Sequence, residues 1–359
     1  MTDSLKPRIF KYDNVKLLAI ILVVIGSVAD EFTGSSDMFR SWFVFSYSFT
    51  APMFVFLCGL FQKQYDGEKI KPEWGRVTFY LMTGTLLKVV IFLIRLAFGR
   101  EAKLDLLGGT GIEWYLFVTA GYMLLMYPLR KVNRYVLLSI TVVIGVVAGF
   151  LPIGDFLYLM RFLVFLPFYV AGYFLSPMKV RRFTHRLNVK LAGIAFIFTY
   201  FVLCFRERDT IYPLRMLFTG RNPYSAVPIA GCTFWHRLLC YGISAVLVIS
   251  VLACMPNRKF PVLTKLGKNV AGVYLWHAPI VLLLSYLGAF DFIVSLGDPL
   301  WKYIMIVGSA GLALLLSIPI FNKPVTIVGE AMRRLSVKTC LIINAIGITI
   351  AAVLQFTVL

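Results

Sequence analysis

The sequence predicts an all-α polytopic membrane protein with about ten or eleven transmembrane helices and a cytoplasmic N-terminus. The 359-residue chain is 59% hydrophobic and only 15% charged, and its mean hydropathy is +0.82. A soluble domain of this length carries about 25% charged residues. The chain therefore has too little polar material to cover a water-facing surface, and long apolar segments recur along the whole sequence.

Eleven apolar segments follow one another along the chain. Each is long enough, or nearly so, to cross a hydrocarbon layer of about 30 Å at about 1.5 Å per residue. The last is an extra C-terminal helix in what we expect to be a single domain over residues 1–359. The segments cover residues 15–30, 42–62, 78–98, 112–127, 135–151, 156–176, 189–205, 237–254, 270–288, 301–321 and 340–358.

The lysines and arginines are concentrated in alternate connecting segments between the apolar ones. The net charge is +19, but the basic residues lie in short stretches between apolar segments, which argues against nucleic-acid binding. Alternate connecting segments, starting with the N-terminal one, hold 24 of the 36 lysines and arginines, whereas the opposite set holds nine. This bias predicts that the N-terminus is cytoplasmic. The start "MTDSLKPRIFKYDN" lacks a cleavage pattern, so we expect the first helix to be retained.

Three basic residues fall inside the predicted spans: Lys88, Arg95 and Arg161. Charges within a membrane are costly and often mark a function, so we expect an anion-binding cluster with Glu113 and Asp155 as its acidic partners. The alternative is that the two arginines extend to the outer headgroups.

Three further residues are candidates for chemistry at mid-membrane depth. Ser27 on the first helix and Thr50 on the second are expected at one level, although hydroxyls in such helices usually bond the carbonyl four residues back. His277, in "VYLWHAPI", is a buried histidine that either transfers protons or is structural. The six cysteines lack metal-ligand spacing, so no metal is expected; only Cys204 and Cys232 could meet in an oxidising compartment.

Five motifs occur in the order found in acyltransferase family 3, particularly its fucose 4-O-acetylase-like branch, which the chain resembles. They read "YDNVKLLAIILVVIGS", "FSYSFTAPMFVFLCGLF", "EWYLFVTAGYMLL", "MRFLVFLPFYVAGYFL" and "LGKNVAGVYLWHAPIV". The resemblance implies an integral-membrane enzyme of a bacterial plasma membrane. Its donor would be acyl-CoA, usually acetyl-CoA, and its acceptor a hydroxyl of a cell-surface or lipid-linked glycan.

The same resemblance assigns positions within the site. The family places a basic residue and a histidine on its first helix, and here Lys16 and Ser27 occupy those positions. The branch has a second histidine on the next helix, where this chain has Thr50. A hydroxyl cannot act as a general base near neutral pH, since its pKa is far too high.

Three hypotheses remain open from the sequence. The protein is an active acyltransferase in which His277, Lys88 or another group replaces the base; a catalytically silent relative that binds a glycan or lipid; or a transporter of a polar or anionic substrate. On the acceptor side we expect the cationic cluster with Tyr224 and Trp235 of the long outer loop. On the donor side we expect the inner residues Lys69, Lys71 and Arg76 to attract CoA phosphates, although control of membrane topology alone would also explain them.

Overall fold

A computed structural model describes residues 8–66 and 72–357, and helices account for most of these residues. The first half contains α1 (Phe10–Glu31), α2 (Asp37–Tyr47), α3 (Thr50–Asp66), α4 (Trp74–Ala97), α5 (Trp114–Leu129), α6 (Arg134–Val147), α7 (Leu159–Phe174) and α8 (Pro177–Thr184). The second half contains α9 (Leu187–Arg206), α10 (Arg208–Ile211), α11 (Arg215–Phe218), α12 (Phe234–Cys254), α13 (Leu263–Leu266), α14 (Val270–Tyr286), α15 (Ala289–Val294), α16 (Leu300–Leu316), α17 (Pro319–Arg334) and α18 (Val337–Thr357). Short 3₁₀ helices lie at Ala148–Phe150, Phe156–Tyr158, Tyr212–Leu214 and Tyr224–Ala226.

The prediction of an all-α polytopic membrane protein is confirmed. Six stretches of the described chain are long and apolar enough to cross a membrane, or seven if α16 and the bent continuation α17 count as one. Shorter apolar helices, including α5 and α14, occupy further predicted spans. Each of the eleven predicted segments lies mainly on helix, so the apolar periodicity located the elements even where a helix is shorter than a full crossing.

One predicted span contains a local break, and one predicted boundary is wrong. The span expected at 42–62 lies within one apolar stretch, Asp37–Gln62, that is long enough to cross a membrane. This stretch has a local break between α2 and α3, where the carbonyl of Ser48 accepts a hydrogen bond of 2.5 Å from Ser244 on α12. The segment 322–339, expected to be an inner loop, contains most of α17, which turns by 50° from α16. Pro319 stands at the start of α17, where a proline's missing N–H costs nothing.

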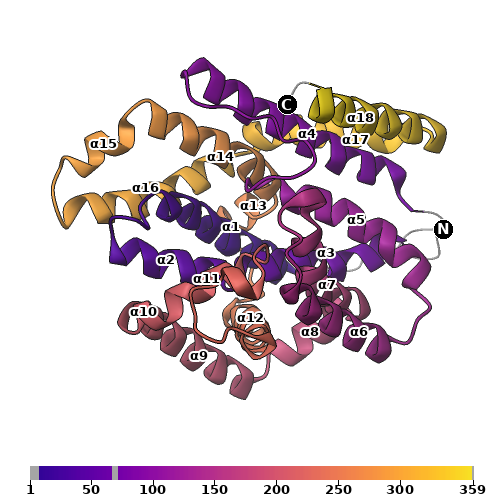
Figure 1. Cartoon of the computed structure of the whole chain (residues 1–359). Helices are drawn as coiled ribbons and strands as arrows, with labels where there is room; N and C mark the ends of the chain where they lie inside the picture. The colour runs from indigo at the N-terminus through magenta and orange to yellow at the C-terminus, as the bar shows by residue number, and fades with distance from the viewer. Residues whose placement is uncertain (1–7, 67–71, 358–359) are drawn as a thin grey trace.

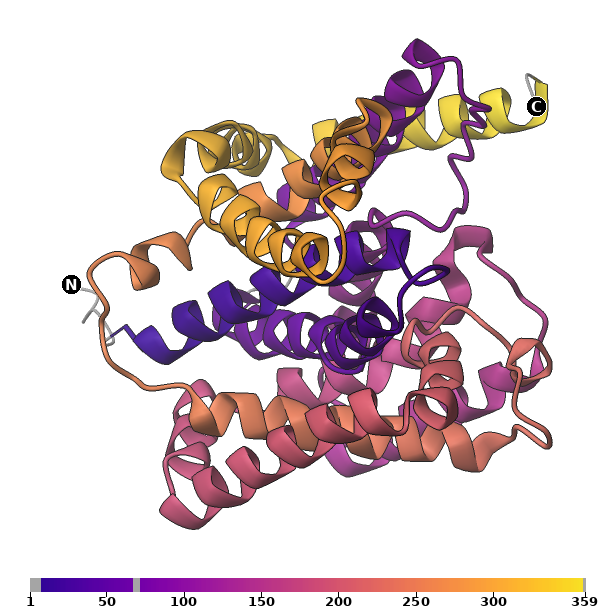
Figure 2. The same cartoon turned by 90° about the vertical axis from the view of Figure 1, so that its left-hand side faces the viewer.

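The centre of the bundle is formed by α1, α3 and α7, with α9 and α12 on one side and α4, α14 and α16 on the other (Figures 1 and 2). Among the described helices, α3 and α7 form the most extensive contact. A Cβ on Gly59 would lie 2.1 Å from the carbonyl oxygen of Tyr169, and one on Gly172 would lie 2.1 Å from that of Phe56. The two backbones approach this closely only because both positions are glycine.

The helix α17 lies crosswise to the bundle. It is seen lengthwise in Figure 1 and close to end-on in Figure 2, whereas α12 is seen the other way round. Its ends contact the first turns of α14 and α4, near Gly272 and Gly75. These turns lie at the end of the bundle that the charge distribution predicts to be cytoplasmic, which we call the inner end.

Candidate functional site

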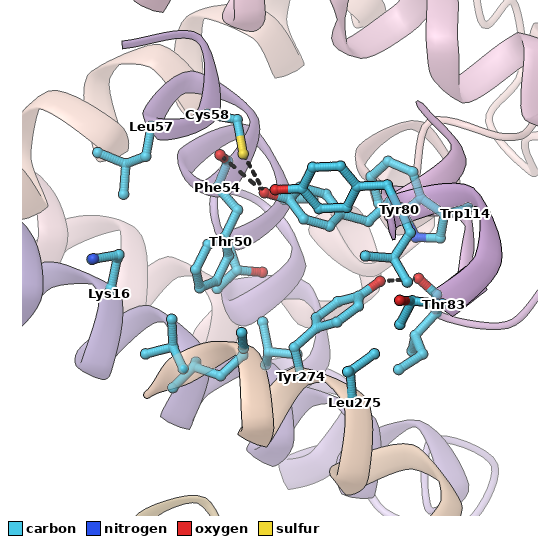
Figure 3. A pocket seen from close by; sticks show the side chains of 18 of the residues that line it. Lys16, Thr50, Phe54, Leu57, Cys58, Tyr80, Thr83, Trp114, Tyr274 and Leu275 are labelled. Atoms are coloured by element: carbon cyan, nitrogen blue, oxygen red, sulfur yellow. Dashed lines mark hydrogen bonds between the residues drawn. The ribbon is translucent and has the colours of Figure 1, made fainter. Parts of the chain in front are cut away.

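A cavity of about 310 Å³ lies between α1, α3, α4, α5 and α14 (Figure 3). Most of its wall is apolar or aromatic. Four residues singled out from the sequence line it together, namely Lys16, Ser27, Thr50 and Arg76. Further polar groups on the wall are Tyr47, Cys58, Tyr80, Thr83, Tyr115 and Tyr274.

Two cations mark the inner end of this cavity. Lys16, in the second turn of α1, forms an ion pair of 2.9 Å with Asp13, a carboxylate that also binds Arg8 at 2.8 Å. Arg76, in the first turn of α4, pairs with Glu73 at 3.5 Å. Since both cations stand near the starts of their helices, they make this end of the cavity attractive to anions.

Two hydroxyls lie deeper along the wall. The Ser27 hydroxyl donates a hydrogen bond of 3.0 Å to the carbonyl of Val23, so it adopts the bond to the residue four back that is usual for serine in a membrane helix. Thr50 is the first residue of α3 and is 4% exposed. Its hydroxyl points into the cavity in Figure 3. It is therefore placed to donate a hydrogen bond to a bound group.

A thiol and two phenols form the opposite wall. The Cys58 sulfur lies 2.8 Å from the Tyr115 hydroxyl, which is also 3.4 Å from the carbonyl of Phe54. The hydroxyl of Tyr274 donates to the carbonyl of Ile112 (Figure 3). Sequence reasoning missed these side chains, although Cys58, Tyr115 and Tyr274 all lie within the family-like motifs.

A separate polar network surrounds Lys88 and Tyr158. The Lys88 ammonium donates to the backbone carbonyls of Asp105, at 2.5 Å, and Gly108. It also lies 5.0 Å from the centroid of the Tyr158 ring. The Tyr158 hydroxyl in turn lies 2.9 Å from Glu113. Lys88 thus holds the connection between α4 and α5 in place. Its partners are backbone oxygens, whereas the sequence analysis expected acidic side chains.

The arginines of the predicted cluster differ from one another. Arg161 is 4% exposed, forms an ion pair of 3.7 Å with Asp155, as predicted, and lies 5.4 Å from the ring of Trp114 on the cavity wall. Arg221 shares the same carboxylate at 3.8 Å. Arg95, which we expected beside Lys88, is exposed near the end of α4.

Comparison with protein families decides the class. The family described as an acyltransferase domain, acyltransferase family 3, matches residues 9–318. The chain belongs to acyltransferase family 3. No curated protein and no solved structure matches it.

The described lining of the cavity in this family 3 protein offers no imidazole or carboxylate to take a proton. Among the described residues that line it there is no histidine, aspartate or glutamate. His277 is fully buried outside the lining, and its Nδ1 atom faces the carbonyls of Val273, at 3.0 Å, and Tyr274, at 2.9 Å. Its position therefore gives no support to the prediction that it replaces the base.

The remaining candidates lie elsewhere in the structure. Tyr224 is buried and donates a hydrogen bond of 2.7 Å to the carbonyl of Val146, while Trp235 is 66% exposed at the start of α12. Neither lines the cavity. Cys204 and Cys232 are free thiols. Lys69 and Lys71 lie outside the described residues.

Proposed function

We propose that this protein is an O-acyltransferase that moves an acyl group, most simply acetyl, from acyl-CoA to a hydroxyl of a cell-surface or lipid-linked glycan. One observation carries the proposal. A single cavity joins the cations Lys16 and Arg76 to the mid-membrane positions Ser27 and Thr50, where the family resemblance places the reacting groups. The setting that fits this activity is a bacterial plasma membrane.

The polarity of the cavity suits a CoA thioester. Its inner end offers two cations to phosphate groups, and its wall between them and Ser27 is mainly apolar and aromatic. Lys16 and Ser27 are three turns of α1 apart, or about 16 Å at 1.5 Å per residue. A donor held by its phosphates at the inner end would extend its thioester toward the hydroxyls.

The acyl group can pass directly from the donor to the acceptor, without a covalent enzyme intermediate. The acceptor oxygen attacks the thioester carbon, the carbon–sulfur bond breaks, and the acceptor proton passes to the CoA thiolate. Thr50 can donate a hydrogen bond to the oxygen that becomes negative in the transition state. A positioned general base contributes about 10²–10⁴-fold in rate, so a cavity without one predicts slow turnover.

One observation favours a second function. Because the described wall has no imidazole or carboxylate, the protein would also suit a catalytically silent relative that binds donor and acceptor without joining them. A transporter of a polar or anionic substrate, the third hypothesis from the sequence, has no observation in this cavity that favours it.

The test is transfer of label from radiolabelled acetyl-CoA in membranes that contain the full-length protein. Label that appears in a glycan or lipid fraction, above membranes with the Lys16→Met variant, supports the acyltransferase. Binding of CoA without any transfer, in an assay supplied with a proven acceptor fraction, supports the silent relative.

A further inference from the structure

The C-terminal helices α17 and α18 lie beyond the part of the chain that matches the family, which ends at residue 318. They nevertheless pack on α4 and α14, two helices that line the cavity. Asn344 of α18 donates a hydrogen bond of 3.1 Å to Thr78 of α4. The extension is therefore built into the same bundle, next to the candidate site.

The start of α17 is fixed on α14. The backbone N–H of Gly272 donates to the Asn322 side chain at 3.1 Å, and the indole N–H of Trp276 donates to the carbonyl of Phe321 at 3.0 Å. A Cβ on Gly272 would lie 3.0 Å from the backbone of α17, so the two helices are in close contact there.

The end of α17 is fixed on α4. A Cβ on Gly75 would lie 2.4 Å from the carbonyl oxygen of Met332 and 2.7 Å from the Cα atom of Arg333. Together with the contacts at Gly272, this close approach means that α17 bridges the first turns of α14 and α4. These are the turns that bound the inner end of the cavity.

Two residues of α17 lie at the cavity or beside its inner end. Val325, midway along the helix, is part of its wall. Arg333 lies at the close contact of α17 with Gly75 of α4, where a Cβ on Gly75 would be 2.7 Å from its Cα atom, and the next residue of α4 is the wall residue Arg76. Arg333 is exposed, so its guanidinium is accessible to a charged group that enters from the inner side.

We propose that α17 is a component of the donor site, in which Val325 forms part of the wall and Arg333 joins Lys16 and Arg76 in binding the donor's phosphates. The inference rests on the proposed function, because it requires a CoA thioester as donor. It assigns to the extension a direct part in substrate binding, in addition to any part in stability.

The test is equilibrium binding of radiolabelled CoA, and separately of uncharged acetyl-pantetheine, to the purified full-length protein in detergent. Arg333→Gln should weaken CoA binding by about two- to fivefold, the range for an exposed charge pair, and leave acetyl-pantetheine binding unchanged. The matched control is Arg334→Gln, which removes the same charge from the next residue and should change neither.

A second pair of variants tests the wall. Val325→Trp should weaken the binding of both compounds, because the larger side chain enters the cavity, whereas Val328→Trp, at an exposed position on the same helix, should not. Equal effects of the two arginine variants would overturn the role of α17 in the donor site, and so would binding that none of the four variants changes. Either result would leave the proposed donor itself in place. A parent protein that binds neither compound would reject the proposed donor and this inference with it.

Discussion

Ser27 on α1 and Thr50 on α3 face the same cavity, one from each of two neighbouring helices. These are the two positions at which the family resemblance places histidines, and both carry a hydroxyl instead. The Ser27 proton is donated to the carbonyl of Val23. On the proposed function, the described lining of the cavity keeps these positions but offers no imidazole or carboxylate to accept a proton, and this combination governs what the site is expected to do.

Lys16 should be a major determinant of donor binding, because its ammonium stands at the inner end of the cavity and is oriented by Asp13. Replacement by methionine keeps most of the side-chain volume and removes the charge. We expect the dissociation constant for CoA to rise roughly tenfold, the lower end for a hydrogen bond to a charged group. Equilibrium binding measures this. Lys131→Met, an exposed residue between α5 and α6, serves as the control, and equal weakening by both variants would contradict the assignment.

Cys58 should be protected by the donor. It is the cysteine on the cavity wall, whereas Cys254 is exposed at the end of α12. A small maleimide should label Cys58 slowly, and saturating CoA should reduce that labelling severalfold while labelling of Cys254 stays constant. Mass spectrometry of the labelled peptides gives both rates at once. Labelling of Cys58 that CoA leaves unchanged would place the donor elsewhere.

Lys88 is expected to stabilise the structure rather than bind substrate. Its ammonium is used by the carbonyls of Asp105 and Gly108, and loss of a partner for buried polar groups costs about 1–3 kcal/mol. Lys88→Met should therefore increase hydrogen exchange in the connection between α4 and α5 without weakening CoA binding. The opposite pattern, a lower kcat/KM with unchanged exchange, would restore the anion-binding role predicted from the sequence.

The contact between α3 and α7 should tolerate no added methyl group. Gly59→Ala would place a Cβ 2.1 Å from the Tyr169 carbonyl oxygen, and the helices would have to separate at a cost of about 1–3 kcal/mol. A clear fall in the thermal midpoint in detergent is expected. Gly242→Ala on α12 is the control, since nothing lies within 4 Å of its added Cβ. It should be neutral or stabilising by up to about 1 kcal/mol.

Much of the fold could be predicted from the sequence because long apolar segments indicate membrane helices. The helix α17 was not predicted, since an amphipathic segment with Lys323 and Pro324 near its start has the composition of a loop. The break between α2 and α3 was also missed, because its stabilising bond comes from Ser244, far away in the sequence.

The site was predictable in part. The motif positions of Lys16, Ser27 and Thr50 located one wall, but the partnership of Cys58 with Tyr115 depends on how two distant helices pack. His277 shows the limit of reasoning from residue type. A histidine at the right depth can face a helix backbone instead of the cavity, and only the packing of α14 decides which.

The most direct test of the account is to restore the missing base. Ser27→His and Ser27→Asn would be compared with the parent protein in membranes supplied with an acceptor fraction, which takes the acetyl group. The readout is release of free thiol from acetyl-CoA, which does not require the acceptor to be identified, and CoA binding is measured in parallel. The account predicts that Ser27→His raises the rate by about 10²-fold or more, while Ser27→Asn, which can hydrogen-bond but not accept a proton near neutral pH, does not. Equal rates for the two variants, with CoA binding intact, would contradict it.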